Sequence, residues 1–235
     1  MKMAEELEIV DEMISDIKSG KYDPDDKLPS ENELADRFHV PRINIRKAYE
    51  RLQELGYIYS RQGKGSFVKD RKNQIPLVLS GDVSFSKKMR ELGYHLESKT
   101  IFCEEIAYNK KIFRFLGVEE TERVFKIGRL RLVDQKPIAI HISYVTQTVF
   151  ENIADVGHDI TSMFDFYNKN GFFNFSSAPS ILSVAFPSKM EREILECSSL
   201  VPLLVIESGC LDKESGTVLE YTKILYRSDR FTYEI

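Results

Sequence analysis

Residues 27–68 read KLPSENELADRFHVPRINIRKAYERLQELGYIYSRQGKGSFV, and this stretch decides the fold of the first part of the chain. Ser30 and Glu33 have the spacing of a capping box, which predicts that a short helix begins there. After the break at His-Val-Pro, apolar residues at helical spacing predict a second helix over about 42–55. Another amphipathic helix is predicted before this stretch, ending near Gly20.

A hairpin is predicted directly after these helices. Residues 57–61 and 66–68 are rich in β-forming side chains and flank the glycine-rich turn at 62–65. Two short helices at a tight turn, followed by a hairpin, are typical of a winged helix-turn-helix, a fold that binds DNA.

Positive charge is confined to this same part of the chain. Residues 37–64 carry 7 Lys/Arg and 2 Asp/Glu, a net charge of +5, whereas residues 1–36 carry −8 and the whole chain −4. A localised basic patch is typical of binding to the phosphate backbone, although a solvated helix face has the same charge pattern. The net charge excludes a protein that binds DNA by bulk positive charge alone.

The composition indicates a folded chain that needs neither a membrane nor a disulfide framework. It has 235 residues, of which 42% are hydrophobic, and no apolar run near the ~20 residues that span a bilayer. The acidic, amphipathic N-terminus is the opposite of a signal peptide. The 3 cysteines lack CxxC spacing and the 4 histidines lack metal-ligand spacing, so we expect no metal, no cofactor and a cytoplasmic location.

The sequence pattern changes after residue 80 and indicates a second domain. We expect a DNA-binding domain over 1–70, a linker over 71–80 and an effector-binding domain over 81–235. The last region alternates short helices with strands and repeats a hairpin around turns that start at Asp134 and Asp212. This weak internal repeat predicts an α+β fold with an antiparallel sheet, and a pocket where the two units meet.

The first seventy residues resemble the DNA-binding domain of GntR-family bacterial transcription factors. The family pattern reads roughly LPSE, SRxTVRxAL, EGL and GxGTFV. The matching segments here are KLPSE at 27–31, VPRINIRKA at 40–48, GYI at 56–58 and QGKGSFV at 62–68.

Residues 81–235 resemble the UTRA effector domain of the HutC subfamily. The resemblance rests on GRLRL at 128–132, KPIAI at 136–140, LEY at 219–221 and LYRSDRF at 225–231. The family implies a homodimeric, ligand-controlled repressor whose effector domain has a chorismate-lyase-like α+β fold.

Arg42 is the candidate for reading bases, because an arginine at the start of the second helix of the motif can grip guanine bidentately. A phosphate contact is its alternative role. Pro41 and Asn44 replace the serine and threonine of the family pattern, but Pro41 can still start a helix and Asn44 can still donate to a phosphate. Asn32 stands where some members use an arginine on a guanine, which puts that base contact in doubt.

Backbone contacts and the wing complete the expected DNA surface. Arg46 and Lys47 are expected to touch phosphates, and the tip at Gly63, Lys64 and Gly65 to enter the minor groove. An ordinary hairpin turn would have the same glycines. The candidate DNA-binding residues are Ser30, Asn32, Arg42, Asn44, Arg46, Lys47, Gly63, Lys64 and Gly65.

Arg129 and Arg131 lie two residues apart on a predicted strand, so their side chains point the same way and suggest a sheltered anion site. The alternative is a sheet face open to water. The resemblance implies that phosphosugar-binding members place the matching arginines on the phosphate, helped by the positions of Ser84, Phe85 and Ser162.

Glu220 shares a predicted strand face with Tyr226, and its carboxylate can accept hydrogen bonds from sugar or polyol hydroxyls. Phosphosugar-binding relatives often have glutamate at the position of His141 and tyrosine at that of Phe164. We therefore expect the anion half of the site to be retained and the selecting half to be altered, with a structural role as the alternative for His141. The candidate effector-binding residues are Ser84, Phe85, Arg129, Arg131, His141, Ser162, Phe164, Glu220 and Tyr226.

These observations predict a homodimeric repressor that a small phosphorylated metabolite, a sugar phosphate or another anion, releases from a palindromic double-stranded DNA operator. The alternative is an enzyme on a chorismate-lyase-like domain with an accessory DNA-binding arm. Only Arg129, Arg131 and Glu220 offer groups for such an enzyme. An assay for turnover of the bound ligand distinguishes the two hypotheses.

Overall fold

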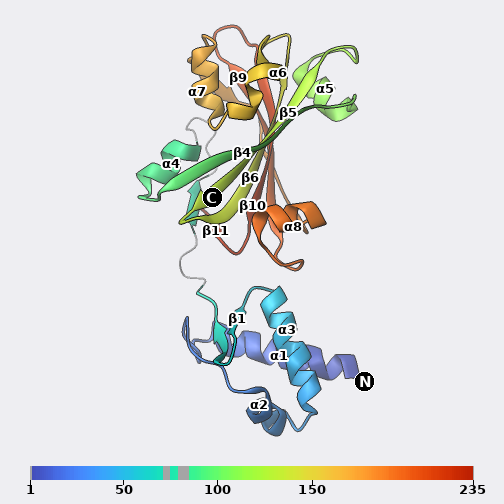
Figure 1. Ribbon diagram of the computed structural model, residues 1–235, viewed down its shortest axis with the longest axis vertical. Coiled ribbons are helices and arrows are strands. Elements are labelled where there is room, and N and C mark those ends of the chain that lie inside the picture. The colour runs from blue at the N-terminus through green and yellow to red at the C-terminus, as the bar shows by residue number, and fades with distance from the viewer. Residues whose placement is uncertain (1, 71–74, 79–84, 235) are drawn as a thin grey trace.

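The computed structural model describes residues 2–70, 75–78 and 85–234, and it shows two regions of different architecture (Figure 1). The N-terminal region places three helices before a two-stranded hairpin, which confirms the predicted winged helix-turn-helix. Its elements are α1 (Lys2–Lys18), α2 (Glu31–Phe38), α3 (Arg42–Glu54), β1 (Ile58–Arg61) and β2 (Gly65–Val68).

Local sequence signals set the ends of α2 and α3. The Ser30 hydroxyl accepts a hydrogen bond from the Glu33 N–H at 3.3 Å, and the Glu33 carboxylate accepts one from the Ser30 N–H at 2.7 Å. This is the predicted capping box. α2 ends at His39, which has a left-handed backbone, and α3 begins after Pro41. Gly56 has a φ of +75°, which lets the chain turn from α3 toward β1.

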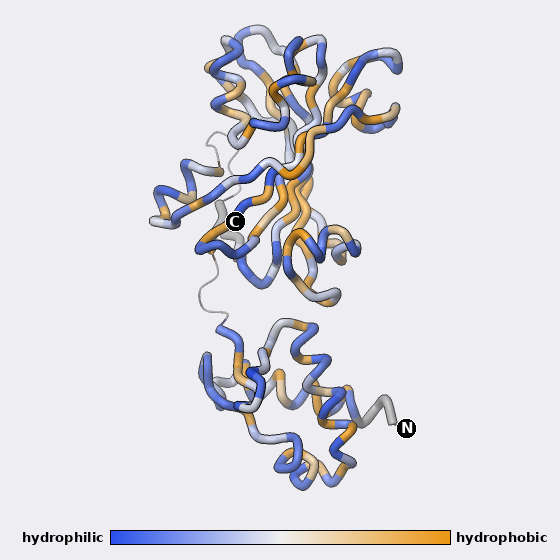
Figure 2. The backbone as a smooth tube through the Cα atoms, in the orientation of Figure 1, coloured by the Kyte–Doolittle hydropathy of each residue, from blue (hydrophilic) through white to orange (hydrophobic). Residues whose placement is uncertain are grey.

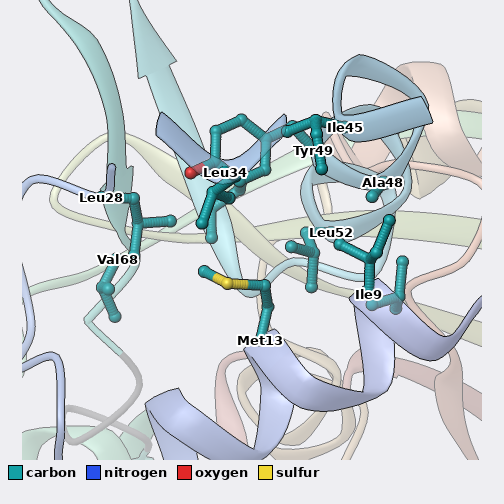
Figure 3. Packing of buried hydrophobic residues seen from close by; sticks show 11 residues of the cluster. Ile9, Met13, Leu28, Leu34, Ile45, Ala48, Tyr49, Leu52 and Val68 are labelled. Carbon is teal, nitrogen blue, oxygen red and sulfur yellow. The ribbon is translucent and has the colours of Figure 1, made fainter. Parts of the chain in front are cut away.

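The helices and the hairpin of the N-terminal region share one apolar core (Figure 3). Ile9 and Met13 of α1 lie in this core with Leu52 of α3, while Leu28 and Val68 contribute from the side of the hairpin. Burying these side chains holds α3 against α1, so the opposite side of α3 faces outward.

The C-terminal region is built on a seven-stranded antiparallel sheet with the order β4-β5-β6-β10-β9-β7, in which β8 also pairs with β9. This confirms the predicted α+β class with an antiparallel sheet. The strands of the sheet are β4 (Leu96–Glu105), β5 (Val124–Val133), β6 (Lys136–Thr146), β7 (Phe175–Ser177), β8 (Ile181–Ala185), β9 (Leu203–Asp212) and β10 (Val218–Arg227). The helices are α4 (Phe85–Glu91), α5 (Lys110–Leu116), α6 (Ile153–Val156), α7 (Met163–Lys169) and α8 (Lys189–Leu195), with a 3₁₀ turn at Gly157–Asp159.

The two predicted hairpins lie side by side at the centre of the sheet. β5 and β6 form the first hairpin after α5, and β9 and β10 form the second after α8. The hairpins meet where β6 pairs with β10. This arrangement is the one that the internal repeat predicts.

Helices cover both faces of the sheet (Figure 1). α4 and α7 pack on one face, through Met89 and Tyr167 among others, and α5 and α8 pack on the other, through Phe113 and Leu195. Figure 2 shows that hydrophobic residues are concentrated along the central strands between these helices. A polar side chain that lies beneath these helices is therefore surrounded mainly by apolar side chains.

A further pair of strands joins distant parts of the chain. β3 (Ile75–Val78) pairs in parallel with β11 (Phe231–Glu234) at the end of the described chain. Ile75 is 3% exposed and packs in the same cluster as Phe231. Part of the segment predicted as a linker therefore forms a strand against the C-terminal region, whereas Ser84 lies outside the described residues.

Polar contacts connect the two regions beside this strand pair. The Lys69 ammonium, just after β2, donates to Asp229 Oδ2 at 2.8 Å. The Ser198 hydroxyl, after α8, donates to the carbonyl of Glu54 at the end of α3. The end of α3 and the end of the hairpin thus both touch the C-terminal region.

Candidate functional site

The first candidate site is the outward face of α2 and α3. Arg42 and Arg46 lie one turn apart at the start of α3, and their side chains are 57% and 49% exposed. Both pair with Glu31 in the first turn of α2, with Arg42 Nε 2.6 Å and Arg46 Nη2 3.4 Å from Glu31 Oε2. The hydrogen bond from Arg42 lowers the pKa of Glu31, and Arg46 adds to the effect against the opposing influence of burial. Glu31 therefore holds the two arginines side by side.

The other candidates on these helices lie in different environments. Asn32 and Lys47 are exposed, and the Ser30 hydroxyl caps α2. Asn44 is only 7% exposed, so its side chain does not share the outer face with the arginines. Ile43 was not predicted as a site residue, yet it is 52% exposed at the start of α3. Ile43 could have been found from the sequence, because it is apolar but does not fall at the helical spacing of the inward-facing residues.

The hairpin presents an exposed basic tip. Gly63 and Gly65 have φ values of +71° and +109°, which non-glycine residues rarely adopt, and Lys64 between them is exposed. Behind the tip, Arg61 Cζ lies 5.1 Å from the centre of the Phe67 ring. The wing therefore carries exposed cations on a narrow turn.

The second candidate site lies on the sheet face that α4 and α7 cover. Arg129 of β5 is paired directly with His141 of β6, and Arg131 follows two residues later on the same face. Glu220 and Tyr226 reach this face from β10. The exposed fractions of these five residues lie between 3% and 7%. The structure thus gathers most of the predicted effector residues in one buried cluster.

Only some of the N–H groups of Arg129 and Arg131 have hydrogen-bond partners among the described residues. Arg129 Nη2 donates to the Ser143 hydroxyl, and Arg131 Nη1 donates to the Ser98 hydroxyl and, at 3.0 Å, to the Thr161 carbonyl. The buried Nε atoms of both arginines find no hydrogen-bond partner among the described residues. A buried guanidinium N–H without a partner costs free energy, so both N–H groups are available to an acceptor on a ligand.

Phe85 of α4 connects three of the other residues. Its ring centre lies 4.7 Å from that of His141 and 5.8 Å from that of Tyr226, and Arg131 Cζ lies 5.9 Å from the Phe85 ring centre. The His141 and Tyr226 rings meet edge to face at 5.6 Å. Aromatic rings therefore border the cationic end of the site.

α7 contributes a different side chain from the one expected. Ser162 caps the helix, because its hydroxyl accepts the N–H three residues later at 3.3 Å. Phe164 packs edge-on against Phe175, with ring centres 4.8 Å apart. Tyr167 is instead fully buried and interacts electrostatically with Glu220, and its hydroxyl has no hydrogen-bond partner among the described residues.

Tyr167 and Ser143 are therefore site residues that the sequence analysis did not include. Tyr167 follows Phe164 by three residues, so the two positions neighbour each other on a helix face. Ser143 follows His141 by two residues, so strand alternation places it on the same face. These spacings are the signals that could have found them.

Burial sets the protonation states in this cluster. Burial lowers the pKa of Arg131 to about 9, with the charge of Arg129 adding to the effect. Burial also lowers the pKa of Arg129, while Glu220 opposes that shift. Because a guanidinium keeps its proton in proteins, both side chains are treated as cations. Burial and the two arginines hold the pKa of His141 well below its ordinary value, so the imidazole is neutral. Burial raises the pKa of Tyr167 well above its ordinary value, and its hydroxyl keeps the proton.

Within the described part of the chain, no group of three or more histidine, cysteine, aspartate or glutamate side chains could hold a metal ion. In the same residues, no helix has both the length and the hydrophobicity needed to cross a bilayer.

Both regions match known family models. Residues 6–68 match the model of bacterial regulatory proteins of the gntR family, and residues 91–232 match that of the UTRA domain.

Relatives share the full arrangement. The chain is 29% identical over 228 residues to the HTH-type transcriptional repressor NagR of Bacillus subtilis, covering 96% of this chain and 91% of that protein. It is 23% identical over 229 residues to the mannosyl-D-glycerate transport/metabolism system repressor MngR of Escherichia coli, covering 97% and 93%. The crystal structure of PhnF from Mycobacterium smegmatis covers 96% of this chain and 97% of its own, with a TM-score of 0.64 and 19% identity, and so has the same fold.

Proposed function

Because the chain belongs to the GntR family of bacterial regulatory proteins and carries a UTRA domain, we propose that it is a repressor that binds a two-fold operator as a dimer and is released by a small anionic effector. Regulation of transcription through DNA binding follows from the family itself and from relatives named as repressors. The same membership excludes the alternative of an enzyme with an accessory DNA-binding arm, since the family consists of regulators. The operator symmetry, the dimer and the effector are the proposed parts.

The DNA-binding role is assigned to the exposed start of α3 and to the wing. Arg42 is placed to grip a guanine in the major groove, and the exposed Ile43 beside it fits the methyl group of a thymine. Arg46 and Lys47 lie further along the helix, where phosphates are in reach. The turn around Lys64 is narrow enough to enter the minor groove.

A dimer is proposed because one reading helix contacts too few base pairs for useful specificity. β8 supports this proposal, since all five of its residues are exposed, including Ile181 at 60% and Val184 at 64%. An apolar edge strand left open to water is an aggregation hazard in a single subunit. Pairing with a second copy would cover it.

The effector role rests on one observation, the buried pair Arg129 and Arg131 whose Nε–H groups have no partner among the described residues. Two cations held in an apolar setting bind an oxyanion more strongly than they would at the surface. Glu220 and Tyr167 add a carboxylate and a hydroxyl that suit sugar hydroxyls. The name of one relative refers to mannosyl-D-glycerate, an anionic sugar derivative, which is consistent with a sugar phosphate or sugar acid here.

The test combines calorimetry with release from DNA. An operator duplex is first selected from a random library by the protein itself, and a panel of sugar phosphates and sugar acids is then titrated against the free protein and the complex. We expect at least one anionic sugar to bind and to weaken the operator complex by roughly 5- to 150-fold, the usual range of such coupling. The double variant Arg129→Ala/Arg131→Ala should lose this binding.

Arg123→Ala is the matched control, because Arg123 precedes the same strand but pairs with Glu105 at the surface. Equal binding of anionic sugars by the wild type and the double variant would place the anion site elsewhere. A sugar that binds tightly without changing operator affinity would refute the switch but not the site.

A further inference from the structure

The buried charges of the effector cluster do not balance without a ligand. Arg129 and Arg131 contribute two positive charges and Glu220 one negative charge, so the cluster carries a net charge of about +1. Charges removed from water need compensation by charges or hydrogen bonds inside the protein. A singly charged anion would make the buried cluster neutral, whereas a doubly charged anion would leave it at about −1.

His141 is the group in this cluster whose charge can change near neutral pH. The groups that face it are Arg129 and Arg131 from β5, Tyr226 from β10 and the uncharged Phe85 from α4. Within its own strand the nearest residues on the same face are the small Ala139 and Ser143. Among the described residues, the charges that act on the imidazole are those of Arg131 and Arg129, and without a ligand these favour its neutral form.

The position of His141 allows direct contact with an anion held by the arginines. It is paired with Arg129 across the β5–β6 ladder and is 5% exposed. Its Nε2 atom is buried without a hydrogen-bond partner among the described residues. Two guanidinium Nε–H groups and one imidazole nitrogen, all unsatisfied in those residues, thus lie on one sheet face.

We propose that His141 reads the charge of the bound effector: a doubly charged oxyanion enters the site together with one proton, which His141 takes up, whereas a singly charged oxyanion enters without it. The proposal rests on the anion site of the proposed function. The proton moves from solvent to the imidazole, and no covalent bond forms or breaks. The resulting imidazolium donates from Nε2 to an oxygen of the anion and restores the charge balance of the cluster.

The consequence is a preference that depends on pH. The second negative charge of the ligand counteracts the two arginines and raises the pKa of His141 in the complex. Binding of the dianion therefore weakens as pH rises through that value, by up to about tenfold per pH unit for one proton taken up. Binding of the monoanion should not depend on this group.

Sulfate and methanesulfonate test the proposal without knowledge of the natural effector. Both are tetrahedral sulfur oxyanions, and neither titrates between pH 5 and 9, so any proton exchanged belongs to the protein. Each is titrated by calorimetry into the full-length protein at constant ionic strength, in two buffers of different ionisation enthalpy. We expect sulfate binding to take up close to one proton near pH 7 and methanesulfonate binding to take up none.

A variant and a spectroscopic signal test whether His141 is the group that takes up the proton. His141→Gln should still bind sulfate, more weakly, with no proton uptake and a flat pH profile, while His158→Gln on the surface should behave as wild type. In the wild type, the ring ¹³C–¹H spectrum should show one of the 4 histidines changing to the imidazolium position when sulfate is added. This measurement needs no variant, so it stands even if His141→Gln does not fold.

The outcomes separate the two proposals. Sulfate binding without proton uptake would refute the role of His141 and leave the anion site intact. Equal proton uptake with both anions would also refute it, because the response would not follow ligand charge. If neither sulfate nor anionic sugars bind, the anion site of the proposed function is wrong, and the role of His141 falls with it.

Discussion

Arg42 and Lys64 are both exposed cations of the DNA-binding domain, but their surroundings predict different effects. Arg42 is oriented by Glu31 at the start of α3, so Arg42→Ala should cost about 1–3 kcal/mol per half-site and relax specificity at one guanine. Lys64 is exposed on the narrow turn of the wing, so Lys64→Ala should weaken all sequences evenly and reduce the salt slope by about one. Fluorescence titrations of operator and random duplexes at several salt concentrations measure both effects. An equal loss on both duplexes for Arg42→Ala would remove its role as a base reader.

Tyr167 separates recognition of the sugar from recognition of the anion. Its buried hydroxyl interacts most strongly with Glu220 and more weakly with Arg129, and it carries no charge of its own. Tyr167→Phe removes only this oxygen, so it should weaken an anionic sugar by roughly 1–3 kcal/mol and leave sulfate binding unchanged. Calorimetry with both ligands measures the difference. A parallel loss of sulfate binding would show that Tyr167 supports the arginines instead.

At the residue scale, most of the effector cluster could be predicted from the alternation of side chains along a strand. Arg129 and Arg131 share a face in any regular strand, so their common direction can be read from the sequence. That this face would be buried depends on α4 and α7 packing over it, which no local pattern contains. The burial of Asn44 could not be predicted for a similar reason. The buried face of α3 is wider than its apolar residues alone indicate.

At the element scale, two capping boxes provide a matched pair. Ser30 caps α2 in the DNA-binding domain, and Ser188 caps α8 in the effector domain with the same reciprocal hydrogen bonds. Each serine-to-alanine change should cost about 1 kcal/mol of helix stability. Ser30→Ala should also weaken operator binding, because α2 holds Glu31 against Arg42, whereas Ser188→Ala should not. Thermal melts and DNA titrations of both variants make the comparison, and an equal effect on operator affinity would contradict this local role.

Elements with local signals were predictable, and elements that depend on distant partners were not. The hairpins around residues 134 and 212 follow from alternation and turn residues, which act within a few positions. β3 is different, because its four residues pair with β11 from the other end of the chain. A strand whose partner lies about 155 residues away has no signature in its own neighbourhood.

At the scale of the whole molecule, a polar link runs from β10, next to the effector cluster, to the DNA-binding domain. Arg227 follows Tyr226 on β10 and forms two hydrogen bonds with Asp229, at 3.1 and 3.0 Å. Lys69 reaches the same carboxylate from the end of the wing. Burial alone would raise the pKa of Asp229, but the hydrogen bonds and charges of Arg227 and Lys69 hold it well below its ordinary value. The carboxylate therefore stays ionised and keeps both partners.

Lys69→Met should uncouple effector binding from DNA release. It removes the link to Asp229 without touching either site, so effector affinity of the free protein should stay near that of the wild type. The effector should then weaken operator binding less than in the wild type, and operator DNA should weaken effector binding less by the same factor. Lys18→Met, an exposed change at the end of α1, is the control. Unchanged coupling in Lys69→Met would show that the signal takes another route.

The last prediction concerns β8 as the interface of the proposed dimer. Among the described strands this one pairs with β9 alone, and the exposed side chains on its two faces include Ile181 and Val184. If a second copy covers it, Val184→Glu places a charge in an apolar interface and should give a monomer by sedimentation at micromolar concentration. The monomer should keep its fold, because Val184 is 64% exposed within the chain, but it should lose most of its affinity for a two-fold operator. Tyr108→Ser, at another exposed position, should remain a dimer. A dimeric Val184→Glu variant with normal operator binding would place the interface elsewhere.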